Sequence, residues 1–148
     1  MTLRGLVDVL LLLGAAILSI AALWHVYWVI GGKRGMQQAI PESDGQALFS
    51  PTPTQTLIAG AVIAAAAILY AAAGLDWPLA AVPQTWVGVA VGAAGLIFVA
   101  RAIGDFNHVG VFNRGGATAF ARADRHYYSP LCFLLGVTGL AAALLRLT

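Results

Sequence analysis

The chain has 148 residues, of which 60% are apolar and only 9% are charged. A soluble domain carries about 25% charged residues, and the six acidic and eight basic side chains present here are too few to cover the surface of one. The composition therefore excludes an ordinary soluble enzyme, a disordered chain and a nucleic-acid-binding protein. It indicates a polytopic membrane protein, which has the lipid bilayer as a partner.

Four apolar stretches reach the length of about 20 residues that crosses the hydrocarbon core of a bilayer. They lie at about residues 6–30, 55–75, 82–103 and 128–147. Because lipid offers the backbone no hydrogen-bond partner, each stretch is expected to be a helix. We predict an all-α fold: a polytopic membrane four-helix bundle in a single domain (residues 1–148), made of two helical hairpins with two longer loops on the same side.

The first stretch is longer than the apolar part of a cleavable signal peptide, which has about 7–15 residues. We therefore expect it to be a retained span. Near its end, His25 and Trp28 are three residues apart and share a helix face. Further along, Ser50-Pro51 and Thr52-Pro53 favour the start of the second helix, where the missing N–H of proline is not needed.

Small residues recur in the third and fourth spans. They are Gly88, Gly92, Gly95, Gly136, Gly139 and Ala143. Small residues four positions apart let two helix backbones approach closely in lipid. Such a face serves either packing within the bundle or formation of a homo-oligomer, and the sequence leaves both open.

The second long loop begins after the third span, which ends near Arg101. Asp105 follows Arg101 by four residues, and Asp124 comes just before the predicted fourth span. Short apolar pieces at residues 109–112 and 119–121 are expected to lie along the membrane interface. The segment Tyr128-Ser129-Pro130 is expected to open the fourth helix.

One pattern occurs in both halves of the chain. The order His-Val, Gly-Gly, aromatic-Ser-Pro appears at residues 25–26, 31–32 and 49–51, and again at 108–109, 115–116 and 128–130. An internal repeat would relate the two hairpins by an axis along the membrane normal. Chance similarity among residues common at membrane interfaces explains the pattern equally well.

The basic residues predict the orientation. Six lie on the side of the long loops: Lys33, Arg34, Arg101, Arg114, Arg122 and Arg125. Only Arg4 and Arg146 lie on the side of the termini. Cytoplasmic segments carry the excess of Lys and Arg, so we predict an inner-membrane protein with cytoplasmic long loops and both termini outside.

Polar and aromatic side chains gather on the loop side and form the candidate pocket. Its residues are His25, Trp28, Arg101, Asp105, Asp124 and Tyr128. A structural interpretation makes Arg101 and Asp105 an i,i+4 ion pair. A binding interpretation gives apolar walls with a few polar groups, in which His25 and a carboxylate orient a ligand or transfer a proton.

A third interpretation is a metal or haem site on His25, His108 and His126, because imidazole is a common ligand. No metal-ligand spacing supports it, and we predict no metal site. The single cysteine, Cys132, excludes an internal disulfide and a CxxC pair. The sequence indicates no particular cofactor.

Four segments carry a resemblance to a known family: His25-Val-Tyr-Trp28 with Gly31-Gly32; Ile40-Pro41 through Leu48-Phe-Ser-Pro51; Arg101-Ala-Ile-Gly-Asp105-Phe106 with Gly110 and Phe112; and Phe120-Ala-Arg-Ala-Asp124 running into Tyr128-Ser-Pro-Leu-Cys132. The chain resembles small bacterial four-span integral membrane proteins classed as a domain of unknown function. The resemblance implies four membrane helices and no established activity, so it assigns no catalytic residue. The chain departs from the pattern at Asn107-His108.

We therefore expect an uncharacterised bacterial inner-membrane protein with a cytoplasm-facing pocket for a lipid-like or other lipophilic small molecule. One alternative is a small intramembrane enzyme that uses His25 with Asp105 or Asp124 on a lipophilic substrate. The other is an accessory subunit of a larger membrane complex.

Overall fold

The computed structural model describes residues 2–43, 46–77, 82–105, 107–112 and 118–147. Four helices are long and apolar enough to cross a membrane: α1 (Leu3–Val29), α3 (Pro53–Gly74), α4 (Gln84–Ile103) and a continuous helix, Ala119–Leu147. The fourth is built from α5 (Ala119–Ala123), a π-helical turn η1 (Asp124–Tyr128) and α6 (Ser129–Leu147). The predicted all-α membrane protein with four spans is confirmed. Of the residues discussed above, Phe106, Arg114, Gly115 and Gly116 lie outside the described part of the chain.

The segment between α1 and α3 holds the remaining elements. These are the single-turn helix α2 (Met36–Ala39) and a two-residue antiparallel pair of strands, β1 (Glu42–Ser43) and β2 (Gln46–Ala47). The start of α3 is the one that the proline pattern predicts. Pro53 stands in the first turn, and Thr52 forms a capping box with Gln55, in which each side chain bonds to the backbone of the other residue.

The fourth span begins earlier than the sequence predicts. Thr118 caps the helix by accepting a hydrogen bond from the N–H of Ala121, so residues 119–121 form the first turn of this continuous helix and not a separate short piece. Pro130 sits inside the continuous helix, where a proline ring crowds the carbonyl four residues back. In the π-helical turn before it, the N–H of Ser129 donates to Asp124, five residues back. This wider turn gives the proline room, so the helix continues through it.

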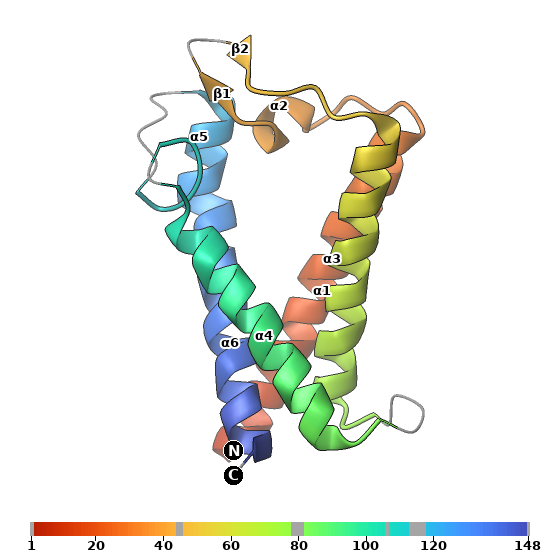
Figure 1. The fold of residues 1–148 in the computed structure, drawn as a ribbon, viewed down its shortest axis with the longest axis vertical. Coiled ribbons are helices and arrows are strands. Elements are labelled where there is room, and N and C mark those ends of the chain that lie inside the picture. The colour runs from red at the N-terminus through yellow and green to blue at the C-terminus, as the bar shows by residue number, and fades with distance from the viewer. Residues whose placement is uncertain (1, 44–45, 78–81, 106, 113–117, 148) are drawn as a thin grey trace.

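The four long helices form two arms joined at one end (Figure 1). One arm is the hairpin of α1 and α3, and the other is the hairpin of α4 and α6. Both chain termini lie at the joined end, and the arms diverge towards α2, α5 and the two strands. The buried core spans both arms near the joined end; its members include Leu11, Leu18, Tyr70, Val91 and Leu135.

Glycines allow the two helices within each arm to lie close together. A Cβ atom at Gly95 would stand 2.8 Å from the backbone oxygen of Gly136, and one at Gly92 would stand 2.8 Å from Cβ of Ala143. In the other arm, a Cβ atom at Gly60 would meet Cβ of His25 at 2.8 Å. The small-residue face of α4 and α6 thus packs within the bundle, which is one of the two roles that the sequence leaves open.

The two copies of the recurring pattern have different local structures. His25 lies within α1, whereas His108 lies in the turn after α4. Ser50-Pro51 precedes α3, whereas Ser129-Pro130 lies inside a continuing helix. The matching residues therefore do not occupy matching places in the two arms.

Candidate functional site

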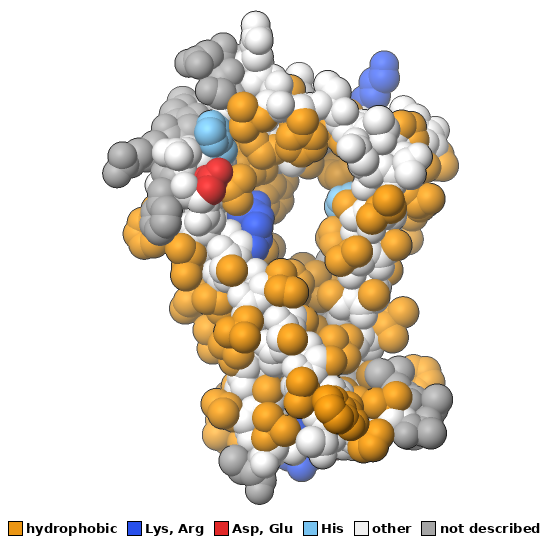
Figure 2. Space-filling model, viewed as in Figure 1, with side chains coloured by type: hydrophobic (Ala, Val, Ile, Leu, Met, Phe, Trp, Pro, Cys, Tyr) orange, Lys and Arg blue, Asp and Glu red, His pale blue; other side chains and the backbone are white. Residues whose placement is uncertain are grey.

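A hollow separates the two arms beyond their shared core (Figure 2). Its floor is built around Tyr70 of α3, which is fully buried. The hydroxyl of Tyr70 donates to the backbone oxygen of Leu135 at 2.8 Å, and its ring meets the ring of Phe98 edge to face, with centroids 6.0 Å apart. These contacts join the arms, and the open-ended space begins above them.

The α1 wall of the hollow carries His25. Residues seven apart share a helix face, and Leu11 and Leu18 are both in the core between the arms. His25 continues this series into the region where the arms have separated, and its Cβ lies beside Gly60 of α3. Its Nδ1 donates to the backbone oxygen of Ala21 at 2.8 Å, which leaves Nε2 without a bond to any described residue.

Trp28 packs against this histidine, as the three-residue spacing predicts. The two rings meet edge to face with their centroids 5.0 Å apart. The indole N–H of Trp28 binds the turn that follows α1: it donates to the backbone oxygen of Arg34 at 2.9 Å. Trp28 therefore fixes both the imidazole ring and the turn that leaves α1.

The opposite wall carries an ion pair between Arg101 of α4 and Asp124 of η1. Nη2 of Arg101 lies 2.8 Å from Oδ1 of Asp124. Asp124 is fully buried, and it also accepts hydrogen bonds from the Ser129 hydroxyl (3.2 Å) and the Gly110 N–H (2.7 Å). Arg101 is one-third exposed. The carboxylate thus joins α4, the turn at Gly110 and the fourth span, while Nη1 of Arg101 is buried without a partner among the described residues.

The predicted ion pair between Arg101 and Asp105 is wrong. Oδ1 of Asp105 accepts the backbone N–H groups of Asn107, His108 and Val109 at 2.8–3.0 Å, so this carboxylate closes its own turn. Bonds from these N–H groups, that of His108 foremost, lower the pKa of Asp105 from 3.8 to about 2. Because Asp105 is occupied in this way, Arg101 takes its partner from the fourth span.

The candidate pocket residues fall into three groups. His25 and Trp28 stand on one arm, and Arg101 and Asp124 stand on the other. Tyr128 follows Asp124 by one turn and packs its ring against Phe120, with centroids 6.4 Å apart. Asp105 belongs to its own turn, and the structure gives no bond between His25 and either carboxylate.

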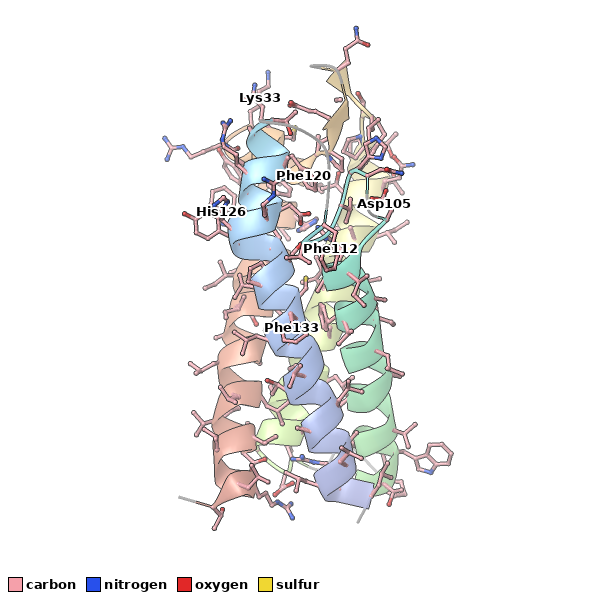
Figure 3. All side chains as sticks on the ribbon, turned by 90° about the vertical axis from the view of Figure 1, so that its left-hand side faces the viewer. Lys33, Asp105, Phe112, Phe120, His126 and Phe133 are labelled. Atoms are coloured by element: carbon pink, nitrogen blue, oxygen red, sulfur yellow. The ribbon has the colours of Figure 1, made fainter. Side chains whose placement is uncertain are left out.

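The three histidines also lie apart. His25 lies in α1, and His108 lies 3.5 Å from Asp105 in the turn after α4. His126 bonds to the backbone oxygen of Arg122, and Figure 3 places it on the opposite side of the view from Asp105. Among the described residues, no group of three metal-ligating side chains could hold an ion.

A second charged cluster lies at the joined end, whereas the sequence predicts that the polar side chains gather on the loop side. The side chain of Arg146 is 2% exposed; its Nη2 lies 3.2 Å from Asp8 and 3.4 Å from Asp76, and it also bonds to the Ala73 carbonyl. Arg4 adds a further ion pair with Asp76 at 3.0 Å. In the sequence, the signal for this cluster is the presence of two basic and two acidic residues near the ends of three apolar spans. In the structure, the cluster links α1, the end of α3 and α6.

Comparison with known proteins places the chain in a family. Residues 18–138 match the model of a family described as a protein of unknown function, DUF3995. The chain belongs to this family. The match covers α3 and α4, the second part of α1 and most of the fourth span, and it includes every residue of the candidate pocket. No curated protein and no solved structure matches the chain.

Proposed function

We propose that this DUF3995 protein is an inner-membrane protein that holds a lipophilic molecule with a polar head group in the hollow between its arms. The observation that carries the proposal is the divergence of the arms above Tyr70 and Leu135, which leaves the hollow of Figure 2. A bilayer does not leave such a space empty, and an elongated apolar molecule suits its walls. Small-molecule sites are typically apolar with a few polar groups that fix orientation.

Polar groups stand on both walls near the open end. Nε2 of His25 is free to accept or donate a hydrogen bond, depending on its protonation. The Arg101 guanidinium, which Asp124 holds in place, has a buried Nη1 without a partner among the described residues, and this atom is a donor. A head group with hydrogen-bonding oxygens would fit between them, with its apolar chain directed towards Phe98.

The bilayer is the favoured source of the ligand. Helix α2 contacts α5 across the open end, so the segment after α1 reaches over to the other arm. The hollow opens between the arms in the view of Figure 2, on a side that would face lipid. We propose that the ligand moves laterally from the membrane into the hollow. In this proposal the loops lie in the cytoplasm and both termini outside, in keeping with the basic residues of the loop side.

The enzyme alternative has less support. General acid–base catalysis needs the two groups within hydrogen-bond reach of each other or of a shared substrate. His25 bonds to its own helix, and the two candidate carboxylates are engaged on the other arm. No described contact favours a proton-transfer pair.

Native mass spectrometry of the gently extracted protein tests the proposal with two matched variants. Gly14 faces Leu135 and Tyr70 in the shared core. Ala21 lies seven residues later on the same face of α1, at the level of the hollow, so the larger side chain of Ala21→Phe would fill the hollow. Ala65→Phe adds the same ring at an exposed position of α3. We expect the wild type and Ala65→Phe to retain a lipophilic molecule and Ala21→Phe to lose it. Equal retention by Ala21→Phe would overturn the proposal, as would a wild type that retains nothing.

A further inference from the structure

The outer surface at the end of α1 carries an aromatic cluster formed by Trp24, Tyr27 and Trp28. The rings of Trp24 and Tyr27 meet edge to face at 5.3 Å, and the Trp24 and Trp28 centroids lie 6.2 Å apart. Trp24 and Tyr27 are about 40% exposed. Tryptophan and tyrosine at this place in a span are typical of the membrane interface, where one end of the ring is in lipid and the other is wet.

The turn after α1 folds back onto this cluster. The N–H of Gly32 donates to the Tyr27 carbonyl at 2.9 Å, and the Trp28 indole bonds to the Arg34 carbonyl. The Tyr27 ring lies directly under Gly32, in space that any larger residue there would need. The backbone of Arg34 is thereby held beside the last turns of α1.

A groove of about 320 Å³ results, lined by Ile20, Leu23, Trp24, Tyr27 and Arg34. It lies apart from the hollow, because Ile20, Leu23 and Trp24 are exposed outer residues of α1. Its apolar part runs along the span, and its only charged residue stands at the interface end. Arg34 is exposed, and no described carboxylate lies within salt-bridge distance of it or of the adjacent Lys33.

We propose that this groove is a binding site for a phospholipid with a net negative head group. The acyl chain lies along Ile20 and Leu23, the glycerol region lies beside Trp24 and Tyr27, and the phosphate meets Arg34. A guanidinium binds phosphate oxygens through two parallel N–H bonds. Lys33 adds a second positive charge, which favours a head group that lacks a compensating ammonium.

The test compares two lipids with the same acyl chains, phosphatidylglycerol and phosphatidylcholine, by counting the molecules that the protein retains in native mass spectrometry. Each basic residue near a membrane surface attracts an anionic lipid by about 1 kcal/mol, which is roughly fivefold in affinity. We expect the wild type to prefer phosphatidylglycerol and Arg34→Gln to lose about fivefold of that preference. Arg125→Gln, which removes an exposed charge from the other arm, is the matched control and keeps it.

Three outcomes would overturn this site. One is an unchanged lipid preference in Arg34→Gln, measured on protein with wild-type helical content. Another is an equal loss in Arg125→Gln, since the effect would then be one of net charge. The third is displacement of the lipid by millimolar inorganic phosphate, which would make a free anion the ligand. Ala21→Phe leaves this groove intact, so failure of the proposed hollow ligand and failure of this site are separate results.

Discussion

Asp124 is the residue on which most of the candidate site depends. It is fully buried, and its two oxygens accept from a guanidinium, a hydroxyl and a backbone N–H that belong to three different parts of the chain. A buried carboxylate keeps its charge only when it is bonded in this way. The pair with Arg101 therefore specifies how the turn after α4 meets the fourth span.

Removal of one partner of this pair is expected to be worse than removal of both. Asp124→Ala leaves Arg101 without its carboxylate, and we expect the free energy of unfolding to fall by about 3 kcal/mol. The double variant Arg101→Met with Asp124→Leu fills the same space with apolar groups and is expected to lose less. Unfolding in mixed micelles, followed by circular dichroism, gives both values. An equal or larger loss in the double variant would show that the ion pair itself stabilises the fold.

Asp105 is expected to respond to pH through its own turn. Its pKa in the folded protein, about 2, lies below the ordinary value of 3.8. The ionised carboxylate therefore stabilises the turn above the ordinary pKa, and this contribution is lost as the pH falls through about 2. NMR resonances of the Asn107, His108 and Val109 amides are expected to titrate together near pH 2, and Asp105→Asn removes the titration. A midpoint at 3.8 or above would contradict the three N–H bonds.

At the scale of the helices, each arm is a tightly packed pair. Glycine is required where α4 meets α6, because the atoms next to Gly95 belong to the backbone of α6 and cannot move aside. In lipid, such packing takes the place of the hydrophobic effect in holding helices together. The arms are therefore expected to behave as rigid units.

Gly95→Leu tests this packing against Ala93→Leu, which places the same side chain at an exposed position of the same helix. Overpacking costs about 1–3 kcal/mol, so we expect a clearly lower melting temperature in detergent for Gly95→Leu only. If both variants melt together with the wild type, α4 and α6 do not pack through this glycine.

The sequence predicts the element content well, because length and hydropathy decide which segments span a membrane. It misplaces the start of the fourth span, since Pro130 reads as a helix start and the π-helical turn that accommodates it has no sequence signal. The sequence also suggests the wrong partner, Asp105, for Arg101. Spacing along one helix suggests that partner, whereas the actual partner, Asp124, is brought close by tertiary packing. The buried Arg146 cluster depends on the same long-range packing.

At the scale of the whole molecule, the proposed function depends on the divergence of the two arms. Arg146 and its carboxylates hold the joined end, Tyr70 bonds across the shared core of the two arms, and the proposed ligand space lies beyond that core. If the arms ran parallel along their whole length, the apolar side chains above Phe98 would close the hollow. The proposed function would then have no site.

Distances between spin labels on the two arms test this arrangement directly. In a Cys132→Ser background, one pair is placed at Ile58 and Ile103 near the open end, and the other at Ile68 and Val89 near the joined end; all four positions are exposed. We predict that pulsed electron paramagnetic resonance in lipid nanodiscs gives a clearly longer distance for the Ile58–Ile103 pair than for the Ile68–Val89 pair. Equal distances for the two pairs would mean parallel arms and would contradict the hollow on which the proposed function rests.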